Sequence, residues 1–392
     1  MAMSTCATGA GRGSSWKDDI MTNILILGGS GMTGRLLARH LLEQSTAKIV
    51  LAARHLDKVE SLAFKLNSQF GGSRVSAVYA DAANAKSLRA ALSGMDIIIV
   101  AAPTTQHSDT VIRTTLECGV DYLDVQFSSR KLAVLKSFDA DIKQSGRCFI
   151  TEAGFHPGLP SAMVRYAALH LDGITSATTA GFLNMGGDLP YTEAVDELME
   201  AFKDYHTDVY REGEWIASGG FKPRKIDFGE GIGVRACYPM FFEELRNLPA
   251  MYPTLEDAGF YISGTNWLVD WIVTPLVMAG LKIAPAKSIK PMGKLMWWGM
   301  RKSAKPPYVV LLKVDAEGTK EGKHAVFTAT VSHQDAYELT AIPVVAALLQ
   351  YLDGSARKPG LWMMGHIVEP IRLFKDMEKM GVAVRRSVEI KN

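Results

Sequence analysis

The chain has 392 residues, enough for two domains that each bury a core. Its hydrophobic content of 47% and charged content of 21% are those of an ordinary globular protein, and a net charge of +2 gives no electrostatic reason to expect a nucleic-acid partner. Four cysteines, Cys6, Cys118, Cys148 and Cys237, are far apart and form no C-x-x-C pair. This spacing favours free thiols in a reducing cytoplasm over a disulfide framework or a metal site.

The first 21 residues are rich in Ser, Gly, Thr and Ala. They contain no apolar stretch of the kind that a secretory signal requires. We expect segment 1–21 to be a disordered lead-in without a chemical role.

The segment Asn23 to Gly34, NILILGGSGMTG, carries the clearest motif. Its first five residues are mostly apolar and predict a strand, and a helical pattern begins at Arg35. Between them, Gly29, Gly31 and Gly34 have G-x-G-x-x-G spacing, which allows a tight turn, a close approach of backbone to phosphate, and close helix–strand packing. A pyrophosphate would face the free N–H groups of the helix. We therefore predict a dinucleotide site over 29–34, which also includes Ser30, Met32 and Thr33.

The region that follows alternates apolar strands with helices. Strands are predicted at 49–53, 74–80, 95–102, 122–125 and 148–151, and helices at 57–70, 85–92, 108–118 and 129–145. Near-continuous apolar strands between helices are typical of a parallel sheet covered on both faces. We predict an α/β Rossmann domain with a doubly wound parallel sheet over 22–152.

The end of the second strand indicates which dinucleotide binds. Many such sites place Asp or Glu there to bind the ribose hydroxyls, but no acidic residue occurs here before Asp57. Arg54 instead offers a guanidinium suited to a 2′-phosphate, which favours NADP over NAD. Asp81, after the third strand, is placed to reach the adenine. The small residues Ala101 and Ala102, after the fourth strand, allow close approach of the rest of the cofactor.

After the segment 154–160 the pattern changes. We predict a second, α+β domain over 153–345 for substrate binding and dimerisation, and C-terminal helices over 346–392 that pack back on the first domain. The predicted helices are 161–171, 192–205, 337–351 and 370–380; the predicted strands are 176–183, 225–228, 234–238, 308–316 and 324–332, the last two forming a hairpin around a polar turn at 317–322.

One apolar segment, 267–283, is nearly long enough to span a bilayer, and 296–300 adds two more tryptophans. Asp270 and Pro275 interrupt it, and a spanning helix needs about 20 cleaner residues. A buried helix pair or a dimer surface is the favoured interpretation. A membrane-facing patch and a lid over an apolar substrate remain open alternatives.

Three residues are candidates for catalysis because they follow predicted strands or lie on the crossover loop: Asp124, Glu152 and His156. His156 could exchange a proton near neutral pH. Each also has a structural interpretation: a packed histidine, a helix cap at Glu152, and a turn anchored by Asp124. A carboxylate-bearing substrate would need a cation, and the second domain offers Arg224, Lys225 and Arg235.

Several of these motifs together resemble the saccharopine dehydrogenase-like family. They are GGSGMTG, the LAAR that ends at Arg54, CGVDYLD at 118–124, AGFHPG at 153–158, and GHIVEP at 365–370. The resemblance covers about residues 22 to 385 and is weakest from about 185 to 300. It implies an NADP-binding domain, a catalytic α+β domain and pyridine-nucleotide oxidoreductase chemistry. Some members of this family reduce imines to secondary amines, and others reduce enoyl groups of long acyl chains.

The sequence thus predicts an NADP-dependent oxidoreductase that reduces a C=N bond in an amino-acid- or polyamine-like small molecule. The alternatives are an enoyl reductase acting on a hydrophobic acyl substrate, and a non-catalytic NADP-binding scaffold that uses its apolar segment to bind a partner or membrane. A cytoplasmic homodimer without a nucleic-acid partner is expected.

Overall fold

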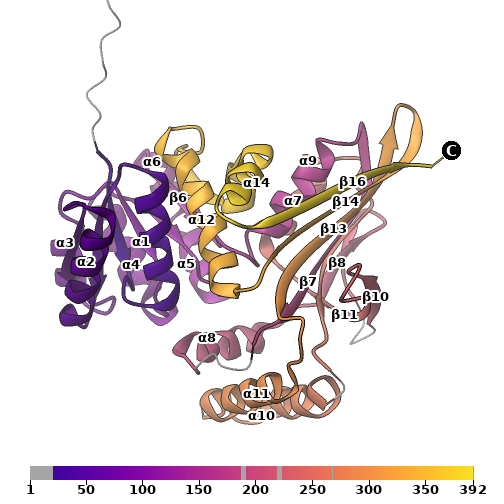
Figure 1. The fold of residues 1–392 in the computed structure, drawn as a ribbon, viewed down its shortest axis with the longest axis horizontal. Coiled ribbons are helices and arrows are strands. Elements are labelled where there is room, and N and C mark those ends of the chain that lie inside the picture. Colours follow the sequence, from indigo (N-terminus) through magenta and orange to yellow (C-terminus); the bar gives the residue numbers. More distant parts are fainter. Residues whose placement is uncertain (1–20, 187–190, 219–222, 267, 286, 392) are drawn as a thin grey trace, which may run out of the picture.

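The computed structural model describes residues 21–186, 191–218, 223–266, 268–285 and 287–391. They form two sheets with a layer of helices between them (Figure 1). The predicted lead-in lies, apart from Met21, outside the described residues.

The first sheet is parallel and has the order β15-β6-β5-β4-β1-β2-β3. Its strands are β1 (Asn23–Leu27), β2 (Lys48–Ala53), β3 (Val75–Tyr79), β4 (Ile97–Val100), β5 (Asp121–Asp124), β6 (Cys148–Thr151) and β15 (Gly360–Met363). The helices are α1 (Met32–Gln44), α2 (Leu56–Phe70), α3 (Ala85–Leu92), α4 (Ser108–Glu117), α5 (Ser129–Ser137) and α6 (Asp139–Gln144). Strand β4 is buried along its whole length, as expected for a strand covered on both faces. The predicted doubly wound α/β domain is confirmed.

Two details of this sheet differ from the prediction. The single helix predicted over 129–145 is wrong, because Phe138 breaks it into α5 and α6. The Phe138 N–H bonds back to Leu135 O in a tight turn, and its ring packs into the core on that face of the sheet. The seventh strand, β15, was not predicted. It is only four residues long and pairs with β6, more than 200 residues earlier in the chain, so no local pattern marks it.

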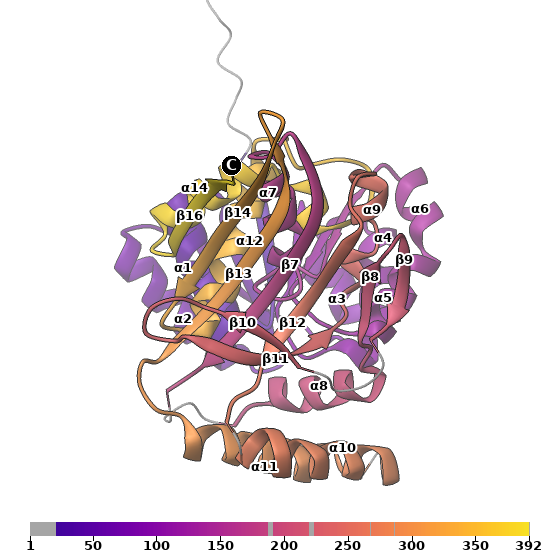
Figure 2. The same cartoon turned by 90° about the vertical axis from the view of Figure 1, so that its right-hand side faces the viewer.

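The second sheet is mixed, with the order β10-β11-β12-β7-β13-β14-β16 and with β8 and β9 joined through β12 (Figure 2). Its strands are β7 (Gly173–Asn184), β8 (Asp208–Arg211), β9 (Glu214–Ala217), β10 (Arg224–Asp227), β11 (Val234–Met240), β12 (Asp257–Ser263), β13 (Val309–Lys320), β14 (Lys323–His333) and β16 (Ala383–Ile390). The predicted hairpin is β13–β14, but the predicted turn at 317–322 is too long. Only Glu321 and Gly322 form the turn, both with positive φ, as a two-residue hairpin turn requires.

The helices between the two sheets are α7 (Leu159–Ala168), α12 (Ala336–Leu352) and α14 (Pro370–Lys379), with the short α13 (Met364–Ile367) beside them. Helix α12 packs against α1 and lies between α1 and the second sheet (Figure 1). Of the C-terminal helices, α12 therefore packs on the first domain, whereas α14 packs on α12, α7 and β16. The C-terminal segment contacts both sheets, because β15 extends the first and β16 forms an edge of the second.

A separate helical layer lies beyond one end of the second sheet (Figures 1 and 2). It consists of α8 (Glu193–Ala201) with the short η2 (Phe202–Asp204), a wide turn η4 (Val269–Val273), α10 (Thr274–Ile283) and α11 (Ile289–Ser303). Two further short helices, η3 (Glu243–Leu245) and α9 (Leu248–Met251), precede β12. Most of the apolar segment predicted at 267–283 thus forms η4 and α10. Among the described residues, no helix is both long and apolar enough to cross a membrane.

Candidate cofactor and active site

The loop between β1 and α1 adopts its conformation because several of its residues are glycines, which have no side chain. Gly28 has φ +89°, and its N–H and that of Gly29 donate to Ala52 O at 2.8 and 3.2 Å. A Cβ at Gly34 would lie 2.3 Å from Gly28 O, so α1 can approach the strand this closely only with glycine. The sequence analysis assigned the turn to Gly29 and missed Gly28. Gly29 instead packs against Leu51, where a Cβ would lie 3.0 Å away.

This loop forms the floor of a cavity of about 760 Å³ at the carboxyl ends of the first sheet's strands. Helix α1 begins after Gly31, which provides no side-chain cap, so the first N–H groups of the helix can bind an anion. The floor and sides contain Leu27, Gly28, Ser30, Gly31, Ala53, Arg54, His55, Ala80, Asp81, Ala82, the segment 101–107 and the segment 127–130. A glycine cradle, open helical N–H groups and an arginine at one side fit a phosphorylated dinucleotide.

The structure brings six of the ten predicted cofactor residues to the cavity wall. They are Ser30, Gly31, Arg54, Asp81, Ala101 and Ala102. The other four, Gly29, Met32, Thr33 and Gly34, belong to the turn and the first turn of α1 and do not line the cavity. Asp81 also fixes its own loop, because Oδ1 accepts the Ala83 N–H at 3.0 Å.

Asp124 lies at the end of β5 and is fully buried away from the cavity. Its carboxylate accepts from Lys131 Nζ at 2.8 Å and from Thr151 Oγ1 at 2.7 Å. It also accepts the N–H groups of Gln126 and Glu152 at 3.1 and 3.2 Å. With its acceptors occupied by these donors, the side chain connects the ends of β5 and β6 and does not line the cavity.

Lys131 and Gln126 complete this network, and the sequence analysis missed both. Lys131 is fully buried and also donates to Gln126 O at 2.8 Å and to Thr151 Oγ1 at 2.7 Å. Gln126 Nε2 donates to Ala102 O at 2.6 Å and so holds the loop after β4 at the edge of the cavity. A lysine seven residues after Asp124, in the first turn of a helix, was the available signal for this network.

Glu152 and His156 lie on the crossover from β6 to α7. Glu152 is 2% exposed and has φ +53°, and burial raises the pKa of its carboxyl to about 8, only partly offset by Lys131. Burial lowers the pKa of His156 to about 4. Glu152 Oε2 and His156 Nε2 have no hydrogen-bond partner among the described residues. At neutral pH the carboxyl therefore keeps its proton and the imidazole is neutral.

Aromatic rings lie between His156 and the cavity. Phe127 lines the cavity, and its ring packs edge-on against Phe242 at 5.3 Å between centroids. The Phe242 ring in turn stacks with His156 at 6.1 Å. Neither His156 nor Glu152 lines the cavity.

The opposite wall of the cavity comes from the second domain. It is formed by Asp196, Glu197, Glu200, Ala201 and Lys203 from α8 and η2, and by Ile289 and Lys290 from the start of α11. Glu197 Oε1 accepts the Thr105 N–H at 3.4 Å across the cavity, and burial raises the pKa of this carboxyl to about 7. The sequence analysis recognised an acidic helix here but could not place it at the site.

The three cations considered for a carboxylate clamp lie elsewhere. Arg224 and Lys225 are on β10 and Arg235 is on β11, all exposed. The Arg224 guanidinium lies 5.6 Å from the Tyr261 ring, and that of Arg235 lies 5.6 Å from the Phe182 ring. None of the three lines the large cavity.

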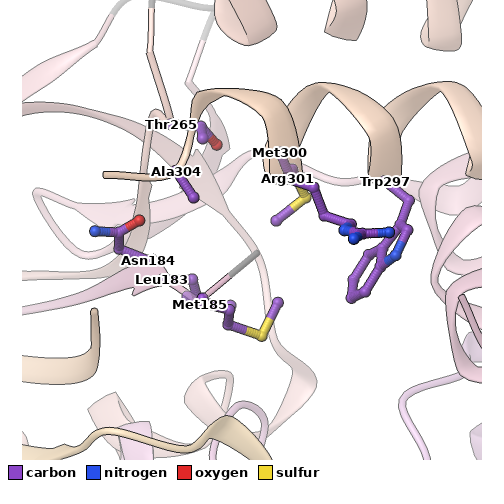
Figure 3. A pocket seen from close by; sticks show the side chains of 9 residues that line it. Leu183, Asn184, Met185, Thr265, Trp297, Met300, Arg301 and Ala304 are labelled. Carbon is purple, nitrogen blue, oxygen red and sulfur yellow. The ribbon is translucent and has the colours of Figure 1, made fainter. Parts of the chain in front are cut away.

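A second pocket lies where the end of α11 meets β7 (Figure 3). Leu183 and Met185 line it from the β7 side, and Trp297, Met300 and Arg301 line it from α11. Its volume is about 20 Å³, enough for about one water molecule, so it is not a substrate site.

Comparison with known proteins shows what this chain is similar to. Residues 24–146, the part of the chain that forms the cavity floor, match the model of the saccharopine dehydrogenase NADP binding domain. The chain is similar to carboxynorspermidine synthase of Vibrio cholerae, with 24% identity over 398 residues that cover 90% of this chain and 94% of that protein. It is also similar to carboxyaminopropylagmatine dehydrogenase of a Synechocystis species, with 22% identity covering 92% and 96% of the two chains.

The fold agrees with these matches. Apo saccharopine dehydrogenase (L-Glu forming) of Saccharomyces cerevisiae superposes with a TM-score of 0.69 at 15% identity, covering 94% of this chain and all of that chain. The two chains therefore share this two-domain fold. The chain thus contains a saccharopine dehydrogenase NADP binding domain, at residues 24–146, within a fold similar to that of saccharopine dehydrogenase.

Proposed function

We propose that the protein reduces a C=N bond formed between an aldehyde and the amino group of an amino-acid- or polyamine-like substrate. Hydride adds to the imine carbon and a proton to the nitrogen, giving a secondary amine and NADP⁺. The observation that carries the proposal is the composition of the cavity walls: a dinucleotide floor on one side and the carboxylates Asp196, Glu197 and Glu200 on the other. The names of the two relatives each contain a polyamine-like compound, carboxynorspermidine and carboxyaminopropylagmatine, which agrees with a cationic substrate.

The chain's own residues provide the cofactor site. We assign the segment 29–34, with Gly28, to the pyrophosphate and Arg54 to the 2′-phosphate. Asp81 would hold the adenine side, and Ala101 and Ala102 leave room for the nicotinamide half. Bound NADPH supplies the hydride, while the protein supplies orientation, charge and the proton.

Glu197 is the residue we assign to the cation and the proton. It lines the cavity, and its pKa of about 7 lets it be either ionised or protonated near neutral pH. Ionised, it can bind a substrate ammonium; protonated, it can donate to the imine nitrogen. Its neighbour Glu200 is paired with Lys203 at 2.5 Å, and Asp196 accepts from Tyr191.

The three residues selected from the sequence receive different roles. Asp124 is an anchor for the cavity edge, because its acceptors are occupied. Glu152 is buried and does not line the cavity, and its pKa of about 8 keeps it protonated at neutral pH, so we assign it a structural role at the crossover. His156, with a pKa of about 4, is neutral and packs behind Phe242.

Assembly and compartment form a further part of the proposal. We propose a homodimer, because β16 leaves an exposed sheet edge with Val388 and Ile390 on it. A cytoplasmic location agrees with Cys118, Cys148 and Cys237, which are free. Sedimentation velocity of the purified protein tests the dimer.

The function is tested by following NADPH absorbance with purified protein. An aldehyde plus a diamine should give turnover, whereas either compound alone should not. Turnover with an α,β-unsaturated acyl compound alone would instead establish enoyl reduction. NADPH binding without turnover on any substrate mixture would favour the non-catalytic scaffold.

A further inference from the structure

The helical layer formed by η4, α10 and α11, residues 268–303, is a hairpin with two different faces; we call it the helical hairpin. Its inner face is packed: Val273, Val277 and Leu281 form a small core with Met296 of α11 and Met199 of α8. Close packing relies on small residues, since a Cβ at Gly280 would lie 2.5 Å from Met292 Sδ. The inner face therefore needs no further partner.

The outer face exposes large apolar side chains. Trp271 is 67% exposed, Leu276 56%, Ile283 83% and Trp298 50%, and Ile272 is also exposed. Five of the eighteen exposed large hydrophobic residues in the described parts of the chain thus lie in this short hairpin. On η4 and α10 they recur at helical spacing, as 272, 276 and 283, on the stripe beside the buried 269, 273, 277 and 281.

Positive charge accompanies this apolar surface. From 268 to 305 the sequence contains seven lysines and arginines and only one acidic residue, Asp270. The excess is six positive charges, while the whole chain has only two, so the remainder of the protein is net negative. Lys294 and Lys302 are exposed along α11 and do not line the large cavity. The one acidic residue, Asp270, makes a hydrogen bond within the same segment of the chain: its Oδ1 accepts the Thr265 N–H at 2.8 Å.

We propose that the helical hairpin docks the protein on an anionic lipid surface, lying in the plane of the interface. Aliphatic and tryptophan side chains would enter the headgroup region, while lysines beside them bind anionic headgroups. The hairpin lies at the outermost edge of the molecule, below α8 in both views, where a flat surface can reach it (Figures 1 and 2). Its helices are too short and too charged to span a bilayer.

Charge also argues against the other occupant of such a face, a second copy of the chain. Two copies facing each other through the hairpin would bring together two clusters of five excess positive charges, from six lysines and arginines and one aspartate in 268–303, which repel. Anionic lipid is complementary to the same cluster. The proposal is independent of turnover, because it concerns a surface and needs no substrate.

Co-sedimentation of the full-length protein with vesicles tests the proposal. We expect binding to phosphatidylcholine vesicles that contain phosphatidylserine, little binding to phosphatidylcholine alone, and weakening of binding as salt is raised. Brominated lipid should quench tryptophan fluorescence, and the quenching should fall in Trp271→Phe, which keeps an apolar ring.

Two kinds of substitution separate the apolar and electrostatic contributions. Leu276→Ser with Ile283→Ser, and Lys294→Glu with Lys302→Glu, should each weaken vesicle binding by about tenfold or more. Matched controls are Phe64→Ser, at a residue 77% exposed on α2, and Lys143→Glu on α6, which should bind like the wild type. Unchanged NADPH affinity and melting temperature show that each variant is folded.

Some results would overturn the proposal. They are equal binding to neutral and anionic vesicles, no binding to either, or equal loss in the control variants. A change of oligomeric state in the hairpin variants without any change in vesicle binding would show that this face is instead an interface between copies of the chain.

Discussion

The floor of the cavity and its opposite wall are made in different ways. The floor, Gly28 to Gly34, is built within one strand–turn–helix unit, and its geometry depends on Cβ atoms that are missing. The wall is an acidic helix of the second domain, α8, joined to the first domain at the cavity by the contact between Glu197 and Thr105. The floor lets the backbone approach a ligand closely, whereas the wall contributes charged carboxylates to the cavity.

This difference suggests a division of roles. The floor would bind any ligand with a pyrophosphate, so changes there should remove cofactor binding altogether. The wall would recognise the second substrate, so changes there should leave cofactor affinity intact and alter turnover. The following experiments test this division.

The largest effect is expected for Gly31→Leu. The Gly31 Cβ position lies 3.2 Å from Gly28 O, and a longer side chain would occupy the space where phosphate approaches the helix. We expect NADPH affinity to fall by about 100-fold or more, measured by calorimetry. Gly72→Leu is the matched control, because no atom lies within 4 Å of a Cβ there. Undiminished binding in folded Gly31→Leu would contradict the assigned floor.

Glu197→Gln tests the wall. The variant removes the charge but keeps the shape, so kcat/KM should fall by about 100-fold while NADPH affinity stays the same. In the wild type, activity should change near pH 7, where Glu197 titrates, and the variant should lose this step. Glu60→Gln on the exposed side of α2 is the control. A loss of NADPH affinity equal to the loss of turnover would remove the distinction between wall and floor.

A smaller change is expected for Arg54→Ala. Loss of a charged contact to the 2′-phosphate should weaken NADPH binding by about 10- to 100-fold. NADH serves as the control within the same variant, since it has no such phosphate and its affinity should not change. Parallel losses for both nucleotides would show that Arg54 acts on the fold of the loop.

The smallest effect is expected for Glu152→Gln, a change in the crossover from β6 to α7, and it concerns the melting temperature. Because folding raises the pKa of Glu152 from 4.5 to about 8, the stability it provides is complete below pH 4.5 and is lost as pH rises through 8. Glu152→Gln stays neutral, so its melting temperature should match the wild type near pH 4.5 and exceed it by several degrees near pH 8.5. Melting curves that differ by the same amount at both pH values would show that Glu152 is not buried as a neutral acid.

Local patterns predicted the first domain well. Helix α3 and strand β6 were predicted to the residue, because each is bounded by a clear signal, such as the Asn84 side chain that caps α3 through the N–H groups of Lys86 and Ser87. Prediction was poorer where partners are distant. Strands β8, β9, β12, β15 and β16 were missed; β15 and β16 add to sheets whose other strands occur much earlier in the chain.

The residues of the candidate site also differ in whether local sequence patterns could identify them. Arg54 and Asp81 could be selected because parallel strands bring their carboxyl ends to one edge. The partners of Asp124 could not be inferred from the sequence, because only the structure shows that Lys131 and Thr151 occupy its carboxylate. Glu197 could not be chosen, because nothing in an acidic helix tells which residue faces another domain.

The amino-acid sequence alone determined the dinucleotide loop and its strand–helix setting, because steric limits on glycine and burial of apolar strands act over a few neighbouring residues. Tertiary structure alone decided which acid faces the cavity, which acid is buried in an ion pair, and which face of the helical hairpin stays exposed. These outcomes depend on contacts between segments far apart in the chain, where desolvation and charge pairing set the balance.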